Sequence, residues 1–269
     1  MNDERPIMVA TDLSARDDRA VDRAIALGRS RHHRVHVVHV TRPTIGVGIA
    51  DVRATLPDPD ADVEVMLPVG SAPETVVRTA AEIGAALIVT GVARFNHLGD
   101  YFLGTAVDHV LRHAPAPVLI VKQRPHGDYR RMLVAVDLSD HSGTTLMTAA
   151  RLFPEAAIDL VHSYHIPFPN RLDSPEMRAF VQGEAQTQLD AFLVTLPAPV
   201  RDRLHIHMKA GETGSVIAKA IDDTGADLVV LGTHGVSGFV HATLGSTTSS
   251  LLTWIKQDTL VVGRPAAAC

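Results

Sequence analysis

The sequence consists of two similar halves, and this repetition restricts the fold more than any other feature of the chain. Four segments of the first half return in the same order in the second. In pairs, they are PIMVATDLS (6–14) and RMLVAVDLS (131–139), VHVVHV (35–40) and IDLVHS (158–163), ALIVTG (86–91) and DLVVLG (227–232), and PVLIVK (117–122) and TLVVGR (259–264). The repetition predicts two copies of one structural unit in tandem.

The spacing between glycines repeats as well. In each half a glycine is followed by a second after 21 positions and a third after 13 more; the sets are Gly70, Gly91, Gly104 and Gly211, Gly232, Gly245. The interval from His162 to Gly211 is 18 residues longer than its counterpart in the first half, which amounts to about five helical turns. SPEMRAFVQGEAQTQLDAFLVTL (174–196) predicts a helix there, so the first copy has lost or shortened this helix.

Apolar strands alternate with helical segments in both halves. Residues 14–31 predict a helix, with a capping box from Ser14 and Asp17 and one face of apolar residues. Continuous Val, Leu and Ile runs separated by helices are typical of a parallel sheet covered on both faces. We therefore predict an α/β fold with two doubly wound, mostly parallel domains, 1–124 and 130–269, joined by the polar segment around 122–131.

Composition excludes several classes of function. The formal charge of −5 argues against broad binding of nucleic acid, and no apolar run reaches the length that spans a bilayer. The one cysteine, Cys269, permits no internal disulfide, and the N-terminal segment is acidic and polar, unlike a signal peptide. We expect a cytoplasmic protein with neither membrane nor nucleic-acid partners.

The segment LGTHGVSGFVHATLGSTTSS (231–250) predicts an anion site. A strand, a glycine-rich loop and the start of a helix present main-chain N–H groups and a favourable helix dipole to a phosphate. Gly232, Gly235 and Gly238 would bend around it, and amides and hydroxyls from Gly245 to Thr248 would bind it. The segment is neither a P-loop, GxxxxGK[ST], nor the dinucleotide fingerprint, GxGxxG after the first strand.

Other chemistries find little support. The chain has 15 histidines, and His205 and His207 share a strand face, but no converging set has the spacing of a metal site. We predict no metal ligands. No GxSxG elbow occurs and no nucleophile–base pair is recognisable, so we predict no catalytic residue and at most slow hydrolysis of a bound phosphate compound.

Gly232-x2-Gly235-x9-Gly245-Ser246, together with VAVD at 134–137, resembles the adenine-nucleotide motif of the universal stress protein family. The resemblance covers nearly the whole chain as two tandem modules. It implies the five-stranded universal stress protein fold, which is like that of the adenine nucleotide alpha-hydrolases. It also implies a stress-response regulator that binds ATP (or AMP or ADP) with Mg²⁺. The implied contacts are Asp137 at the ribose or adenine, Ala135 and Ser163 at the base, and Gly232, His234, Gly235, Gly245, Ser246 and Thr247 around the ribose and phosphates.

The first half departs from this pattern. Arg94 stands where the second glycine of the motif belongs, and it would either obstruct the loop or bring a guanidinium to a phosphate. The resemblance makes this half a weaker candidate for nucleotide binding, through Asp12, Val40, Gly91, Arg94, Gly104 and Thr105.

The resemblance also implies how the halves associate. The last strand of the module mediates dimerisation in this family, so PVLIV and TLVV predict an internal pseudo-dimer, with a further homodimer left open. The functional alternative to an adenine-nucleotide-responsive regulator is a nucleotide-free scaffold that acts through protein partners. The sequence identifies no such partner.

Overall fold

A computed structural model describes residues 5–14, 18–42, 46–92, 94–95, 101–102, 104–166, 174–233 and 244–263. Its elements follow the alternation that the sequence predicts. In the first half they are β1 (Ile7–Ala10), α1 (Asp18–Arg31), β2 (Val35–Val38), α2 (Ile49–Ala54), β3 (Glu64–Met66), α3 (Ala72–Glu82), β4 (Leu87–Thr90), β5 (Arg94–Phe95), β6 (Tyr101–Phe102), α4 (Thr105–His113) and β7 (Val118–Ile120).

The second half repeats this order with a longer helix after its second strand. Its elements are β8 (Arg131–Ala135), α5 (Asp140–Leu152), β9 (Ala157–Tyr164), α6 (Pro175–Thr195), α7 (Ala198–Arg201), β10 (Leu204–Ala210), α8 (Thr213–Thr224), β11 (Leu228–Gly232), α9 (Ser246–Trp254) and β12 (Asp258–Val262). None of the helices in the described ranges is long and apolar enough to cross a membrane.

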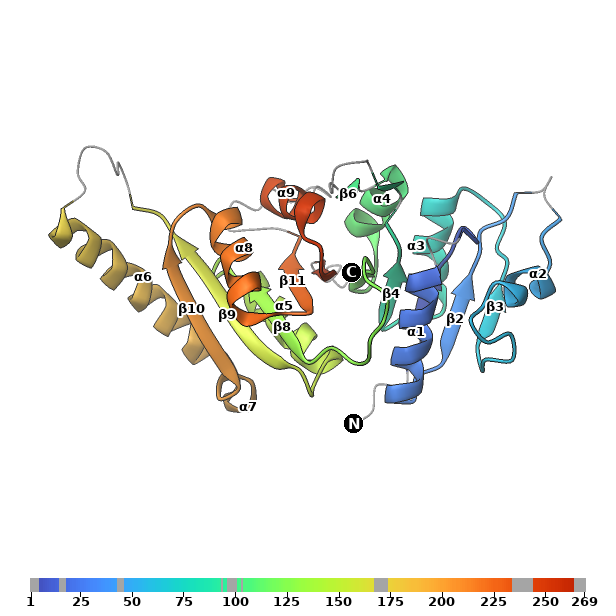
Figure 1. Ribbon diagram of the computed structural model, residues 1–269, viewed down its shortest axis with the longest axis horizontal. Helices are drawn as coiled ribbons and strands as arrows, with labels where there is room; N and C mark the ends of the chain where they lie inside the picture. Colours follow the sequence, from blue (N-terminus) through green and yellow to red (C-terminus); the bar gives the residue numbers. More distant parts are fainter. Residues whose placement is uncertain are drawn as a thin grey trace.

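The strands form one ten-stranded sheet in the order β10-β9-β8-β11-β12-β7-β4-β1-β2-β3, and β5 pairs only with β6. Within each half all five strands of the large sheet are parallel. The halves lie side by side, with α6 and β10 at one end of the molecule and α2 and β3 at the other (Figure 1). The predicted fold of two tandem five-stranded units is confirmed.

The two half-sheets join through the antiparallel pair of β7 and β12. Leu119 lies opposite Leu260, and both are fully buried. The two leucines are structural counterparts, because they pair with the equivalent residues Val89 and Val230. This register differs by one residue from the sequence alignment of 117–122 with 259–264. A local twofold axis therefore passes between these two leucines, which is the geometry of an isologous dimer interface made within one chain. This confirms the internal pseudo-dimer.

Helices cover both faces of the sheet, and each core continues across the junction. One core includes side chains of α1, α2, α5 and α6; the other includes side chains of α3, α4, α8 and α9. Alternate strand residues enter opposite cores, as Ile7 and Met8 show, because successive side chains of a strand point to opposite faces.

The helix that differs between the copies is shortened in the first half rather than lost. There α2 has six residues, whereas α6 has 21 and begins after Ser174, whose hydroxyl accepts a bond from the Met177 N–H. The first helix predicted from the sequence is confirmed over its described part, where α1 runs from Asp18 to Arg31. Asp17, the partner in the predicted capping box, lies outside the described residues.

A buried polar cluster around Asp258 binds the linker between the halves, residues 122–131, to β12. Asp258, at the start of β12, is 1% exposed. It accepts bonds from the backbone N–H groups of Lys122 (2.7 Å) and Gln123 (2.9 Å) and from the Tyr129 hydroxyl (2.5 Å). Arg23 of α1 lies 3.5 Å from the same carboxylate and 4.2 Å above the Tyr129 ring. The first helix of one half is thus tied to the last strand of the other.

The Lys122 ammonium lies beside this cluster at the end of α9. Nζ donates to the carbonyl oxygens of Leu252 (3.1 Å) and Ile255 (2.7 Å), and the side chain is almost completely buried. Burial lowers the pKa of Lys122 to about 7, and Asp258 opposes that shift only in part. The lysine therefore loses its proton far more readily in the folded chain than in the unfolded one.

We predict that Asp258→Asn lowers the free energy of unfolding by about 3–5 kcal/mol, because Arg23 would be left buried without its counter-charge. Urea unfolding followed by circular dichroism measures the change. Asp223→Asn is the control, since Asp223 forms an exposed pair with Lys219, and we expect a loss below about 1 kcal/mol there. Equal effects of the two substitutions would show that the cluster does not hold the halves together.

We also predict that stability rises with pH above neutrality. Between pH 7 and the unfolded pKa of 10.5 the unfolded chain keeps a proton that folded Lys122 releases, so raising the pH favours the folded state. One such group contributes a slope of at most about 1.4 kcal/mol per pH unit.

Urea unfolding at several pH values from about 7.5 to about 9 measures this slope above the usual titration range of histidine. Lys122→Met should remove it, and Lys219→Met, at an exposed site, should keep it. A wild-type curve without slope in this range would contradict the prediction.

Candidate functional site

Each half has a cleft at the point where its strand order reverses. In the second half, β8 lies between β9 and β11, and the connections from β8 and β11 leave on opposite faces of the sheet. Loops diverge there at the carboxyl ends of the strands, which is where such sheets bind ligands. A cavity of about 430 Å³ opens at this position, within the usual size range of ligand pockets.

Most of the residues predicted from the sequence line this cavity. They are Ala135, Asp137, Ser163, Gly232, Gly245, Ser246 and Thr247. His234 and Gly235, and with them Gly238, lie outside the described residues. The structure thus brings together residues from four separate segments, and their roles in binding stay predictions.

The Asp137 carboxylate is held in place by two serines. Oδ1 accepts bonds from the Ser139 hydroxyl (2.6 Å) and the Ser142 hydroxyl (2.5 Å), and Ser139 is the N-cap of α5. Leu138, between Asp137 and Ser139, has φ 64°, a backbone conformation that residues other than glycine rarely adopt. The capping role that competes with ligand binding therefore belongs to Ser139, and Asp137 is oriented at the cavity wall.

Gly232 is required by packing against α5. A Cβ at this position would lie 3.0 Å from the His141 ring and 3.3 Å from Thr145 Oγ1, closer than ordinary contacts. His141 is itself buried and its Nε2 lies 3.1 Å from the Val262 carbonyl oxygen. Packing against α5 thus favours glycine at the start of the loop. Because glycine has no side chain, a ligand can also approach the backbone closely there.

The first turn of α9 is anchored to the end of β11. The Gly245 N–H donates to the Thr233 carbonyl (2.8 Å), and Thr248 Oγ1 donates to the Gly232 carbonyl (2.8 Å). A Cβ at Gly245 would lie 3.2 Å from the Thr233 oxygen. The helix therefore starts directly above the strand end and directs its first amides at the cleft.

Three of the described helices, α5, α8 and α9, begin beside this cavity, and α5 has Asp140 in its first turn. Glu212 caps α8 and accepts bonds from the N–H groups of Gly214 (3.0 Å) and Ser215 (2.8 Å), which hold its pKa below the ordinary value. In contrast, α9 begins after Gly245 and has no acidic residue in its first turn. An anion is favoured at the α9 end of the cavity, where the helix dipole is uncompensated.

The opposite end of the cavity is shaped by β9 and α8. The Ser163 and Thr213 hydroxyls are 2.9 Å apart, and the apolar side chains of Val161 and Ile217 lie beside them. His162 Nδ1 donates to the Val136 carbonyl (3.0 Å), which fixes the loop after β8. A flat ring with polar edges fits such a wall, since apolar surface covers its face and hydroxyls meet its edge.

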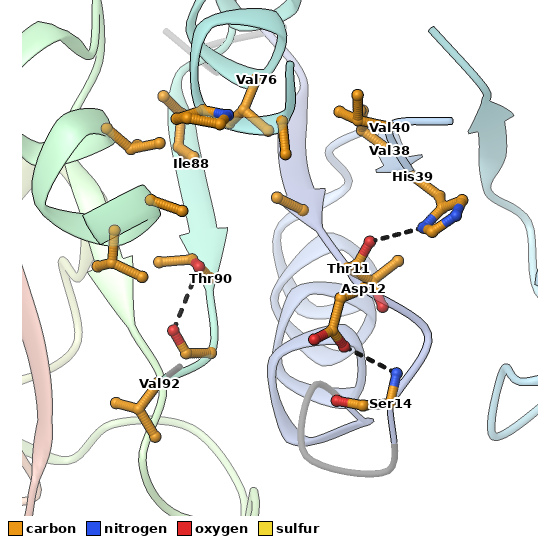
Figure 2. A pocket seen from close by; sticks show the side chains of 17 residues that line it. Thr11, Asp12, Ser14, Val38, His39, Val40, Val76, Ile88, Thr90 and Val92 are labelled. Atoms are coloured by element: carbon orange, nitrogen blue, oxygen red, sulfur yellow. Dashed lines mark hydrogen bonds between the residues drawn. The ribbon is translucent and has the colours of Figure 1, made fainter. Parts of the chain in front are cut away.

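The first half repeats this framework around a cavity of about 310 Å³. Leu13 has φ 62°, the Asp12 carboxylate accepts from the Ser14 N–H (2.8 Å), and His39 Nδ1 donates to the Thr11 carbonyl (3.0 Å) (Figure 2). Val40 and Gly91 also line the cavity.

The other candidates of the first half lie near this cavity. Gly104 is the N-cap of α4 and Thr105 is its first residue. Arg94 is described only as part of the backbone of β5. The two alternatives for its side chain, obstruction or a contact to phosphate, therefore stay open.

Sequence reasoning missed several contributors to the site of the second half. Ser142 orients Asp137, Thr213 faces Ser163, and His141 packs on Gly232. Thr213 lies two residues after Gly211, one of the repeated glycines, so the sequence did carry a signal for it. Nothing in the sequence placed His141 against Gly232, because α5 and β11 are about ninety residues apart in the chain.

Among the residues that the structure describes, no three His, Cys, Asp or Glu side chains converge in a way that could hold a metal ion.

Two tandem units with the same strand order, each with a cleft at its topological switch point, define a class of α/β proteins. The model of the universal stress protein family matches residues 4–61, 46–122 and 128–263, that is, both halves. The chain belongs to the universal stress protein family. Proteins of this family act in the response to stress.

Individual relatives are more distant. Universal stress protein E of Photorhabdus laumondii is 25% identical over 197 residues, 68% of this chain and 63% of that protein, so the match spans less than two thirds of that relative. The structure of a universal stress protein from Archaeoglobus fulgidus DSM 4304 has a TM-score of 0.68 at 16% identity, over 97% of this chain and 99% of that chain. It shares the fold.

Another solved family member, a universal stress protein from Archaeoglobus fulgidus, is in complex with dAMP. It is 27% identical to this chain, with a TM-score of 0.35, and covers 44% of this chain and 97% of its own.

We predict that Thr248→Val lowers the free energy of unfolding by about 1 kcal/mol, because the Gly232 carbonyl loses its bond to the hydroxyl. The change preserves shape, and Val107 occupies the equivalent position in the first half. Urea unfolding measures the difference. Val107→Thr, the reverse change at the equivalent position, is the control, and it should not raise the free energy of unfolding. If Thr248→Val unfolds like the wild type, the hydroxyl does not anchor the helix.

Proposed function

We propose that the cleft of the second half binds an adenine nucleotide, ATP in the first place, and that occupancy regulates the response of the protein to stress. The observation that carries the proposal is the start of α9. There an uncapped helix end and the hydroxyls of Ser246 and Thr247 lie in the same cavity as the oriented Asp137.

In this proposal each part of the ligand has its own place in the cavity. Phosphates would lie at the N-terminus of α9, because main-chain N–H groups and the dipole favour negative charge there. The carboxylate of Asp137 would accept hydrogen bonds from the ribose hydroxyls. Adenine would pack against Val161 and Ile217, with the hydroxyls of Ser163 and Thr213 at its edge.

Mg²⁺ would accompany a triphosphate and would be held chiefly by phosphate oxygens and water, as this ion usually is. The chain contributes binding and orientation in this proposal, and no lining side chain is assigned a catalytic role. ADP and AMP would bind through the same ribose and adenine contacts. The cytoplasmic location expected from the sequence is part of the proposal.

Heat extraction of freshly purified protein, with chromatography of the released nucleotide, tests occupancy, and isothermal titration with ATP and Mg²⁺ tests affinity. We predict about one nucleotide per chain, and a binding constant weakened at least about tenfold by Thr247→Phe. Thr247 is exposed at the mouth of the cavity, so a ring there blocks the phosphate end without disturbing the core.

Ala106→Phe is the matched control, because Ala106 is the equivalent exposed residue of α4. It should leave ATP affinity unchanged. Gly235→Val should abolish binding with the fold intact, since the motif requires close approach of the backbone.

The alternative function remains a nucleotide-free scaffold. It would replace the proposal if no nucleotide is released and ATP fails to raise the melting temperature. A ligand at about 100 times its dissociation constant would otherwise add about 2.7 kcal/mol to stability. Two nucleotides per chain would instead show that both clefts bind.

A further inference from the structure

In the described residues the two clefts have the same strand order and the same helix starts, but their polar groups are placed differently. The helices at their mouths, α4 and α9, each have nine residues and a glycine N-cap. Hydroxyls that line the second cleft are replaced by apolar side chains in the first. In pairs, second half then first, they are Ser163 and Val40, Thr213 and Ala72, Thr247 and Ala106, and Thr248 and Val107.

Polar groups have been gained elsewhere in the first cleft. Thr11 stands where the second half has Val136, and Thr90 stands where it has Leu231, and all four side chains line their cavities. Thr11 precedes Asp12 at the end of β1, and Thr90 is the last residue of the neighbouring strand β4. In the second cleft the hydroxyl groups lie mainly at the helix starts, whereas in the first cleft they lie at the strand ends.

Figure 2 shows the result of this exchange. Thr11, Asp12 and Ser14 lie together at the end of β1, Thr90 lies across from them at the end of β4, and Val38, Val40, Val76 and Ile88 lie toward the other end of the view. Eleven of the seventeen lining residues are aliphatic or proline. A ligand that fits this cleft is apolar over most of its surface.

Charge at the helix ends disfavours phosphate in this cleft. Asp108 lies in the first turn of α4 and is paired with Arg112 of the same helix at 2.8 Å. Glu74 lies in the first turn of α3 and accepts a bond from the hydroxyl of Ser71. Both helix starts at the cavity already have a carboxylate in their first turn, which offsets part of the helix dipole that would attract a phosphate.

We propose that the cleft of the first half binds a neutral small molecule that is mainly hydrocarbon and carries one hydroxyl or amine group. The hydrocarbon part lies against the valines and Ile88, and its polar group donates to Asp12 at the strand end. The ligand is small, because the cavity of about 310 Å³ is near the lower limit of such sites. This cleft is distinct from the nucleotide cleft and does not depend on it.

1-Aminoanthracene is a suitable probe, since it is neutral near pH 7, has one amine on a hydrocarbon frame and becomes fluorescent in apolar surroundings. Titration of the full chain should give about one bound probe, and saturating ATP should leave the probe in place. Anthracene-1-carboxylate, of similar size and opposite in polar character, should bind at least about tenfold more weakly because of Asp12.

The two phenylalanine variants separate the clefts. Ala106→Phe should weaken probe binding at least about tenfold by filling the mouth of the first cleft, and Thr247→Phe should leave it unchanged. Val40→Ser, which restores the hydroxyl of the second half, should weaken it several-fold. Circular dichroism confirms folding of each variant, and ATP titration of the same samples tests the nucleotide cleft separately.

The proposal is overturned if the wild type gives no fluorescence, or if both Ala106→Phe and Val40→Ser bind the probe as the wild type does. It is also overturned if ATP or Thr247→Phe displaces the probe, because the probe would then occupy the second cleft. Loss of ATP binding alone would overturn the proposed function and leave this inference standing.

Discussion

The antiparallel pairing of β7 with β12 is the interaction on which the rest of the molecule depends. It joins two five-stranded sheets at Leu119 and Leu260, which are equivalent residues facing each other, so both cores run through the whole chain. Asp258 then fixes the connection between the halves through its bond from the Lys122 backbone N–H and its buried ion pair with Arg23. The helix that Lys122 caps, α9, is the one that begins at the nucleotide cleft, and β6 of the first half lies against it.

Duplication within one chain leaves the framework of both clefts under the same constraint while their linings are free to differ. The strained leucines at 13 and 138 and the bonds of His39 and His162 are the same in both halves, because strand geometry and helix packing depend on them. Side chains that only line a cavity are not needed for strand geometry or helix packing. Val40 in place of Ser163 changes the chemistry of a cleft without moving the strand beneath it.

Much of the candidate site could be predicted from the sequence, because the glycine spacing and the strand-end aspartate are local patterns. Asp137, Gly232, Gly245 and their neighbours do meet in one cavity. The motif could not explain Gly232, whose small size is required by His141 from a distant helix. It also directed attention in the first half to Arg94, whereas the lining of that cavity differs most clearly at Val40, Ala72 and Ala106.

The sequence by itself determined the tandem repeat, the alternation of strands and helices, the shortened helix and the family. All of these follow from the spacing of the glycines and from the order of the apolar runs, which are patterns along the chain. Only the tertiary structure decided that Asp258 and Arg23 are buried together, that Glu212 occupies one helix start and leaves another for an anion, and that the two clefts differ in polarity. These properties arise between residues far apart in sequence, where burial and charge depend on which surfaces the fold brings into contact.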